Sequence, residues 1–187
     1  MDLKKKLSLG VSALIGRRAT LNTGIKLGNR YKVVCHDGHG NLKWIDYITN
    51  LVVDEGLDDT LDKYLKGSGY TAAHYLGLTD GTPSVAAGDD MTTHAGWTEV
   101  EDYDEGVRQT ATWGSVSGKS VDNSGSPAVF TIDSNSTTIG GAFLVTDSTK
   151  GGTSGILYGG GAFDAGDKVL DDNDTLTVTM TATAAAS

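Results

Sequence analysis

The side chains most able to do chemistry are four histidines and one cysteine. The histidines are His36, His39, His74 and His94. Their spacing matches neither HExxH nor a carboxylate-flanked metal site. Cys35 precedes His36 on an expected strand, so the thiol and the imidazole point to opposite faces and do not form a catalytic pair. The sequence therefore predicts ordinary solvated or packed histidines and a small core residue at Cys35.

Three acidic clusters are the places where calcium could bind, namely residues 89–90, 101–105 and 171–174. None follows the order of oxygen ligands of an EF-hand loop. Residues 171–174 stand before an expected strand, where Asp and Asn favour a surface turn over a calcium site. The glycine run 159–161 lacks the lysine and the helix of a phosphate cradle, which favours a turn or bulge. The chain contains no GxSxG motif, and we predict a protein that is not an enzyme and that uses no cofactor or metal.

These side chains belong to a chain of 187 residues with a formal net charge of −9. Residues 1–50 carry nine basic and three acidic side chains, a net charge of +6, whereas the remaining 137 residues carry a net charge of −15. This separation predicts a basic N-terminal arm, residues 1–30, on an acidic body, residues 31–187. The acidic total argues against broad nucleic-acid binding, and no apolar run is long enough to span a membrane as a helix.

The arm combines basic side chains with apolar residues at helical spacing. The apolar residues are Leu3, Leu7, Val11, Leu14 and Ile15. A signal peptide is not favoured, because Arg17 and Arg18 stand where a cleavage site would be needed. Two interpretations stay open, a loosely ordered tail and an arm that becomes ordered against the acidic surface of a partner. The candidate partner-binding residues are Lys4, Lys5, Lys6, Arg17, Arg18, Lys26 and Arg30.

The body alternates short extended runs with turn residues. Residues 31–36 and 41–48 flank the loop 37–40 and predict a hairpin. Further strands are expected over 70–78, 97–103, 107–117, 127–132, 138–146, 155–159 and 175–183, the last with clear period-two alternation. The predicted fold is mainly β, a β-sandwich or jelly-roll-like body with one short α-helix and an extended N-terminal arm.

The short helix is expected over residues 54–66, with Gly67 as its C-terminal stop. Leu57, Leu61 and Leu65 recur at helical spacing together with Tyr64. We predict that the three leucines face the sheet. The acids expected on the solvent side are Asp58, Asp59 and Asp62.

Seven segments between residues 50 and 183 resemble a group of small structural proteins of tailed bacteriophages. They are NLVVDEGL (50–57), LDKYLKGSGYTAAHYLGLTDG (61–81), HAGWTEV (94–100), SVDNS (120–124), TIGGAFLV (138–145), LYGGGAF (157–163) and DTLTVTMT (174–181). The resemblance implies a virion structural protein and carries no catalytic residue.

Within that group we favour a capsid decoration, or cement, protein that binds and stabilises the lattice of the major capsid protein. It would be assembled in the host cytoplasm, located on the capsid surface, and self-associated as a dimer or trimer. One alternative is a tail component, either a tube or fibre-associated subunit or a receptor- or carbohydrate-binding module. Trp97, Tyr103 and Trp113 could then line a sugar-binding face, although core positions are favoured for them. The other alternative is a hydrolase of unrecognised type.

Overall fold

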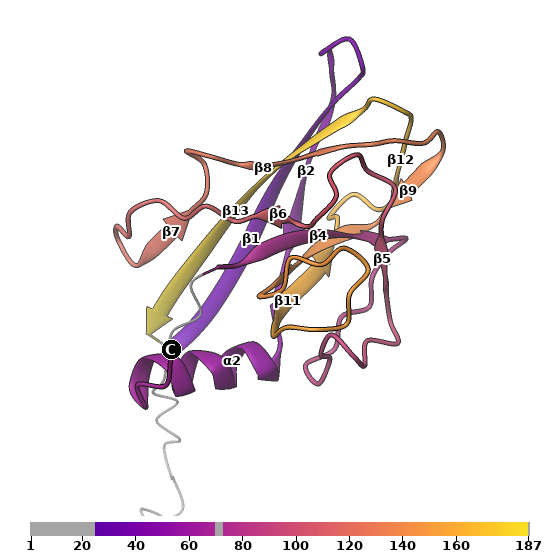
Figure 1. Cartoon of the computed structure of the whole chain (residues 1–187). Coiled ribbons are helices and arrows are strands. Elements are labelled where there is room, and N and C mark those ends of the chain that lie inside the picture. Colours follow the sequence, from indigo (N-terminus) through magenta and orange to yellow (C-terminus); the bar gives the residue numbers. More distant parts are fainter. Residues whose placement is uncertain (1–24, 70–72, 187) are drawn as a thin grey trace, which may run out of the picture.

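The computed structural model describes residues 25–69 and 73–186, and its described part is built from antiparallel sheets (Figure 1). In the first sheet the order is β2-β1-β13-β7, with β8 also paired to β13. Its strands are β1 (Ile25–His36), β2 (Leu42–Thr49), β7 (Ser120–Asp122), β8 (Ala128–Thr131) and β13 (Thr175–Ala186). The long β1 and β13 pair along their whole length, from Ile25 opposite Ala186 to His36 opposite Thr175.

The second sheet has the order β3-β11-β10-β4-β5, with β6 also paired to β4. Its strands are β3 (Leu51–Val52), β4 (Tyr75–Asp80), β5 (Thr98–Val100), β6 (Gln109–Thr110), β10 (Gly141–Val145) and β11 (Leu157–Ala162). A small third sheet pairs β9 (Thr137–Ile139) with β12 (Lys168–Leu170). The mainly β prediction is confirmed.

The main core lies between the two large sheets. Strand β13 turns Leu176, Val178 and Met180 inward, with none of their surface exposed, while the intervening threonines face outward. These side chains share one apolar cluster with Leu76 and Leu78 of β4 in the other sheet. The body is therefore a β-sandwich, and the period-two prediction for residues 175–183 is confirmed.

A smaller core covers the outer face of the second sheet. Phe143 of β10 lies opposite Gly77 of β4, where an added Cβ would come within 2.3 Å of the Phe143 ring. Met91 and Trp97, from the segment that follows β4, complete this cluster. Trp97 is 6% exposed and Tyr103 belongs to the main core at 1%, so both are core residues and share no sugar-binding face.

The helical segment comprises α2 (Asp54–Thr60) and the π-turn η1 (Leu61–Leu65). The amide of Lys66 donates to the carbonyl of Leu61 at 3.1 Å, which closes the wide turn. Gly67 follows with φ of 80°, a left-handed conformation that glycine adopts readily. The predicted helix over 54–66 and its glycine stop are confirmed.

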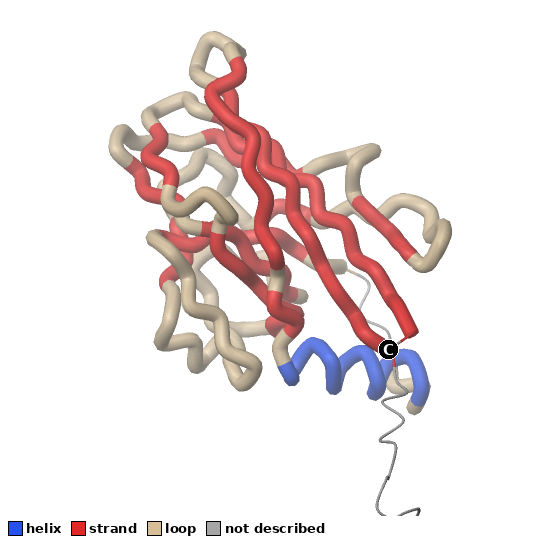
Figure 2. Tube along the Cα trace, turned by 180° about the vertical axis from the view of Figure 1, so that it is seen from behind, coloured by secondary structure: helices blue, strands red, loops and turns tan. Residues whose placement is uncertain are grey.

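The predicted orientation of this helix is wrong. Leu57, Leu61 and Leu65 are 37%, 55% and 75% exposed, whereas Gly56 and Asp59 are buried against the body. The physical reason is close backbone packing, because an added Cβ on Gly56 would lie 2.7 Å from the Tyr158 Cα. A leucine face would hold the helix too far from β11 for this contact. Figure 2 shows the helix lying across one end of the strands.

Two further differences concern strand limits. Strand β1 begins at Ile25, so residues 25–30 belong to the first sheet and the body extends further toward the N-terminus than residue 31. Residues 107–117, expected as one strand, contain only the two-residue β6. The backbone amide of Arg108 donates to the carbonyl of Ser148, and its buried guanidinium binds the carbonyls of Asp147 and Gly152, so this part of the segment bonds to the loop between β10 and β11.

Candidate binding surface at one end of the sandwich

Backbone hydrogen bonds anchor the start of α2 to the body. The amide of Val53 donates to the Tyr158 carbonyl at 3.2 Å, and the amide of Asp54 donates to the Ala87 carbonyl at 2.8 Å. The Glu55 carboxylate accepts from the Leu157 amide at 2.8 Å, and burial raises the pKa of Glu55. These contacts hold the helix against β11 without using its leucines.

A polar and aromatic network underlies the buried side of the helix. The Tyr158 hydroxyl donates to Asp59, whose carboxylate also lies 3.9 Å from the Lys63 ammonium. The Tyr158 ring meets His74 edge to face at 4.9 Å between centroids. The Trp113 indole N–H donates to His74 Nδ1 at 3.4 Å. Burial lowers the pKa of His74, while the negative charge of Asp59 opposes that shift.

Tyr158 reaches this network because of a bulge. Leu144 pairs with Gly159 but Val145 pairs with Leu157, so Tyr158 is the extra residue of β11. The turn or bulge predicted for the glycine run 159–161 is wrong, because these three residues pair in register within β11 and the bulge lies at Tyr158. Gly161 belongs there because an added Cβ would lie 2.6 Å from the Thr49 carbonyl oxygen.

An apolar cavity of about 400 Å³ opens between the two sheets beside the helix. Thr60 of α2, Leu27 of β1 and Ala184 of β13 all border it. His74 and Trp113 also line this cavity, whose surface is almost entirely apolar. The shared border places the beginning of β1 and the end of β13 next to the helix, as both figures show.

The outer side of the helical segment is apolar and open. It consists of Leu57, Leu61, Tyr64 and Leu65, with Tyr64 87% exposed, and is called here the apolar helix face. An amphipathic helix normally turns its apolar stripe to the core, so this one is inverted. Exposed apolar patches rimmed by polar residues mark interaction sites. The apolar helix face is therefore a candidate binding surface.

A second exposed feature is a row of basic side chains on β1. Lys26, Arg30 and Lys32 alternate with residues that face the sandwich, and all three are exposed. The Arg30 guanidinium lies 4.4 Å above the ring of Tyr47 on β2. We call Lys26, Arg30 and Lys32 the basic row.

The basic row contains two of the predicted partner-binding residues, Lys26 and Arg30, which the structure places on a strand and not in the arm. The other five lie outside the described residues. They are Lys4, Lys5, Lys6, Arg17 and Arg18.

The sequence predictions for Cys35 and its neighbour are confirmed. Cys35 is fully buried in the main core, and burial raises the pKa of its thiol to about 12. His36 lies on the opposite face of the same strand and His39 is exposed in the hairpin loop. His94 stacks on Trp97 with ring centroids 3.8 Å apart, which is a packing role.

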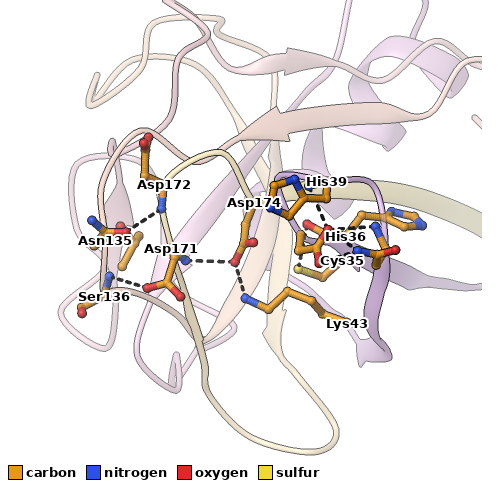
Figure 3. A network of polar contacts seen from close by, with 12 residues as sticks. Cys35, His36, His39, Lys43, Asn135, Ser136, Asp171, Asp172 and Asp174 are labelled. Atoms are coloured by element: carbon orange, nitrogen blue, oxygen red, sulfur yellow. Dashed lines mark hydrogen bonds and ion pairs between the residues drawn. The ribbon is translucent and has the colours of Figure 1, made fainter.

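The acidic cluster 171–174 forms the predicted turn (Figure 3). Asp174 is buried, accepts from the Asp171 amide at 2.9 Å, and pairs with the Lys43 ammonium. This hydrogen bond raises the pKa of Lys43. Asn173 adopts a φ of 68°, as turn asparagines often do. The contacts tie the turn before β13 to the hairpin of β1 and β2.

Asp90 likewise organises a turn. Its carboxylate accepts hydrogen bonds from Thr92 and Thr93 at 2.7 Å, and these lower its pKa to about 2. Within residues 25–69 and 73–186, no group of three or more His, Cys, Asp or Glu side chains is placed to hold a metal ion. In the same described residues, no helix is long and apolar enough to cross a membrane.

Comparison of the chain with protein-family models, with curated proteins and with solved structures found no match.

Sequence reasoning missed the residues that seat the helix, namely Gly56, Asp59, His74 and Tyr158. One signal could have revealed the first of them. A glycine inside a strong helical pattern costs about 1 kcal/mol and usually has a packing reason. No comparable signal in the sequence marks Asp59 as buried, because its partner Tyr158 lies 99 residues away.

Proposed function

We propose that this protein is a capsid decoration protein of a tailed bacteriophage, which binds the major capsid protein lattice and stabilises it. The observation that carries the proposal is the basic row, because it places three exposed cations on one face of β1, in a chain whose residues 1–24 also carry a net charge of +4. A basic row on a body with an acidic net charge is suited to one-sided binding of an acidic partner. The resemblance of segments within residues 50–183 to phage structural proteins supports the same role.

The proposed contact is modest in each copy and repeated over the shell. Lys26, Arg30 and Lys32 and the arm lie against acidic shell subunits, while the acidic remainder of the body faces solvent. Many linked copies of one weak contact give high total affinity. Dimers or trimers at the symmetry axes of the shell provide that linkage.

The test is sedimentation of the purified protein with undecorated heads across a salt series. Raising ionic strength from about 0.05 M to 0.5 M shortens the Debye length from roughly 14 Å to 4 Å, so occupancy should fall sharply. Replacing the three residues of the basic row by Ser should mimic high salt, as should replacing Lys4, Lys5, Lys6, Arg17 and Arg18 by Ser. Lys66→Ser, which removes an exposed lysine from the other end of the helical segment, is the matched control and should bind normally.

Binding in hundreds of copies at every salt concentration by wild type and both variants would reject the electrostatic contact. Absence from heads combined with co-purification with tails would reject decoration and favour the tail component.

A further inference from the structure

The apolar helix face has no partner among the residues that the structure describes. Leu61, Tyr64 and Leu65 are each more than half exposed, and fully burying an aliphatic or aromatic side chain contributes about 1.5–3 kcal/mol. The inner side of the same helix is already occupied by Tyr158 through Gly56 and Asp59. The helix cannot rotate to bury its leucines without losing these contacts, so cover must come from outside the described body.

The chain supplies a segment of matching character at the right place. Residues 1–24 precede Ile25, and β1 begins at the end of the sandwich where Leu27 and Thr60 border the same cavity. The apolar residues of this segment recur at helical spacing from Leu3 to Ile15. Residues 19–24 alone reach about 20 Å when extended, more than the 10–12 Å diameter of a helix. The segment can therefore cross from β1 to the outer side of α2.

Charge complements this apolar match. Residues 1–24 carry five basic side chains and one acid, a net charge of +4, whereas residues 54–66 carry five acids and two lysines, a net charge of −3. Asp54 and Asp58 are exposed at the rim of the apolar helix face. Lys4 precedes Leu7 by three residues and Arg18 follows Ile15 by three, so both basic groups fall beside the apolar stripe.

We propose that residues 1–24 bind the apolar helix face of their own chain, with Leu57, Leu61, Tyr64 and Leu65 packed against the apolar stripe of the segment. The same chain is the favoured source, because a covalent connection of a few residues gives a millimolar effective concentration that a second copy in dilute solution does not reach. The inference concerns the free protein and does not depend on the proposed virion role. It adds to that role by leaving Lys5, Lys6 and Arg17, which fall away from the stripe, available to an acidic shell.

The test is paramagnetic relaxation in the intact chain. A nitroxide is attached to the single accessible thiol of Ser8→Cys, since the native Cys35 is fully buried. The amide signals of residues 57–66 should be lost in the oxidised label and return on reduction. Those around Val169, exposed on β12, should stay unchanged.

Two sets of variants make the test specific. Changing Leu57, Leu61 and Leu65 together to Ser should restore the signals, and because these residues are exposed the protein should still fold. Changing Leu7, Val11 and Leu14 together to Ser should do the same from the other side of the contact. The matched control changes Leu42, Ile45 and Val169 to Ser, since these are exposed apolar residues elsewhere on the body. In this control the amide signals of residues 57–66 should still be lost.

A mixed sample identifies the source of the segment. Chains that carry the nitroxide but no ¹⁵N are mixed with ¹⁵N-labelled chains that carry no nitroxide. No amide signal should be lost from residues 57–66. Loss in the mixed sample would overturn the same-chain proposal and assign the contact to a second copy. Retention of all signals in the singly labelled chain would overturn it outright.

Discussion

Arg108 and the helix α2 each belong to a region that buries a charged group, and the two regions differ in what they leave exposed. Arg108 has no exposed surface, and its guanidinium pairs in two places with Glu99 at 2.7 and 2.9 Å. It also donates to the carbonyls of Asp147 at 3.0 Å and Gly152 at 2.6 Å, and lies 5.2 Å above the Phe143 ring. This region is closed, because every one of these partners belongs to the described body.

The helix α2 also buries a charged group, since Asp59, on the side of the helix that faces the body, is 7% exposed. Its contacts with Tyr158 and Lys63 satisfy the inner side and turn the leucines outward. The difference separates a region that only stabilises the fold from one that leaves apolar surface for a partner. Substitutions should therefore affect stability strongly at Arg108 and binding more than stability at the apolar helix face.

The largest effect is expected for Arg108→Leu. The substitution leaves Glu99 buried without a cation and should lower the free energy of unfolding by about 3–5 kcal/mol. Urea unfolding measures this. The double variant Arg108→Leu with Glu99→Leu should recover part of the loss, and a double variant no more stable than the single one would contradict the idea that the unpaired carboxylate causes it.

The next effect concerns the seat of the helix. Gly56→Ala raises helix propensity, yet its methyl group would meet the Tyr158 carbonyl oxygen at 2.9 Å, so the helix must shift. Forced overpacking typically costs about 1–3 kcal/mol, and we expect a net destabilisation in thermal unfolding. Gly69→Ala is the control, because nothing lies within 4 Å of an added Cβ there. Equal melting temperatures for the two variants would show that the close contact between Gly56 and the Tyr158 backbone does not set the orientation of the helix.

The inverted helix makes a smaller, sharper prediction. Asp59→Ala removes the carboxylate that accepts a hydrogen bond from the partly buried Tyr158 hydroxyl and should cost about 1–3 kcal/mol. Leu61→Ala, on the exposed side, should stay within about 0.5 kcal/mol. Chemical denaturation of both variants measures which of them loses more of the free energy of unfolding. A larger loss for Leu61→Ala would show that the leucine side carries the packing in the intact protein.

The smallest effect is a pH dependence at His74. Burial lowers the folded-state pKa of His74 below its ordinary value of about 6.5, so between these two values the unfolded chain binds more protons. Stability should therefore fall as pH is lowered through that window. His74→Gln should flatten this part of the profile, and His39→Gln, in the exposed hairpin loop, should not. Identical profiles for wild type and His74→Gln would contradict the assignment.

Local signals predicted much of the fold. The alternation in residues 175–183, the turn at 171–174 and the helix ending before Gly67 each depend on neighbours within a few residues, and all three are present. The segment 107–117 was mispredicted, because its apolar and threonine residues favour a strand locally while Arg108 is held by carbonyls 39 and 44 residues away. The candidate surface was predicted only in part, through Lys26 and Arg30.

Residues 54–66 form a helix with an apolar stripe for a reason that lies in the sequence alone, since helical periodicity is a local property. Which side of that helix meets the body depends on contacts with distant segments. The side was selected by the bulge at Tyr158 and by the close approach that Gly56 permits, two features brought together across about a hundred residues. Contact between distant segments has no local signal, so the apolar helix face emerges only when the sheets have assembled.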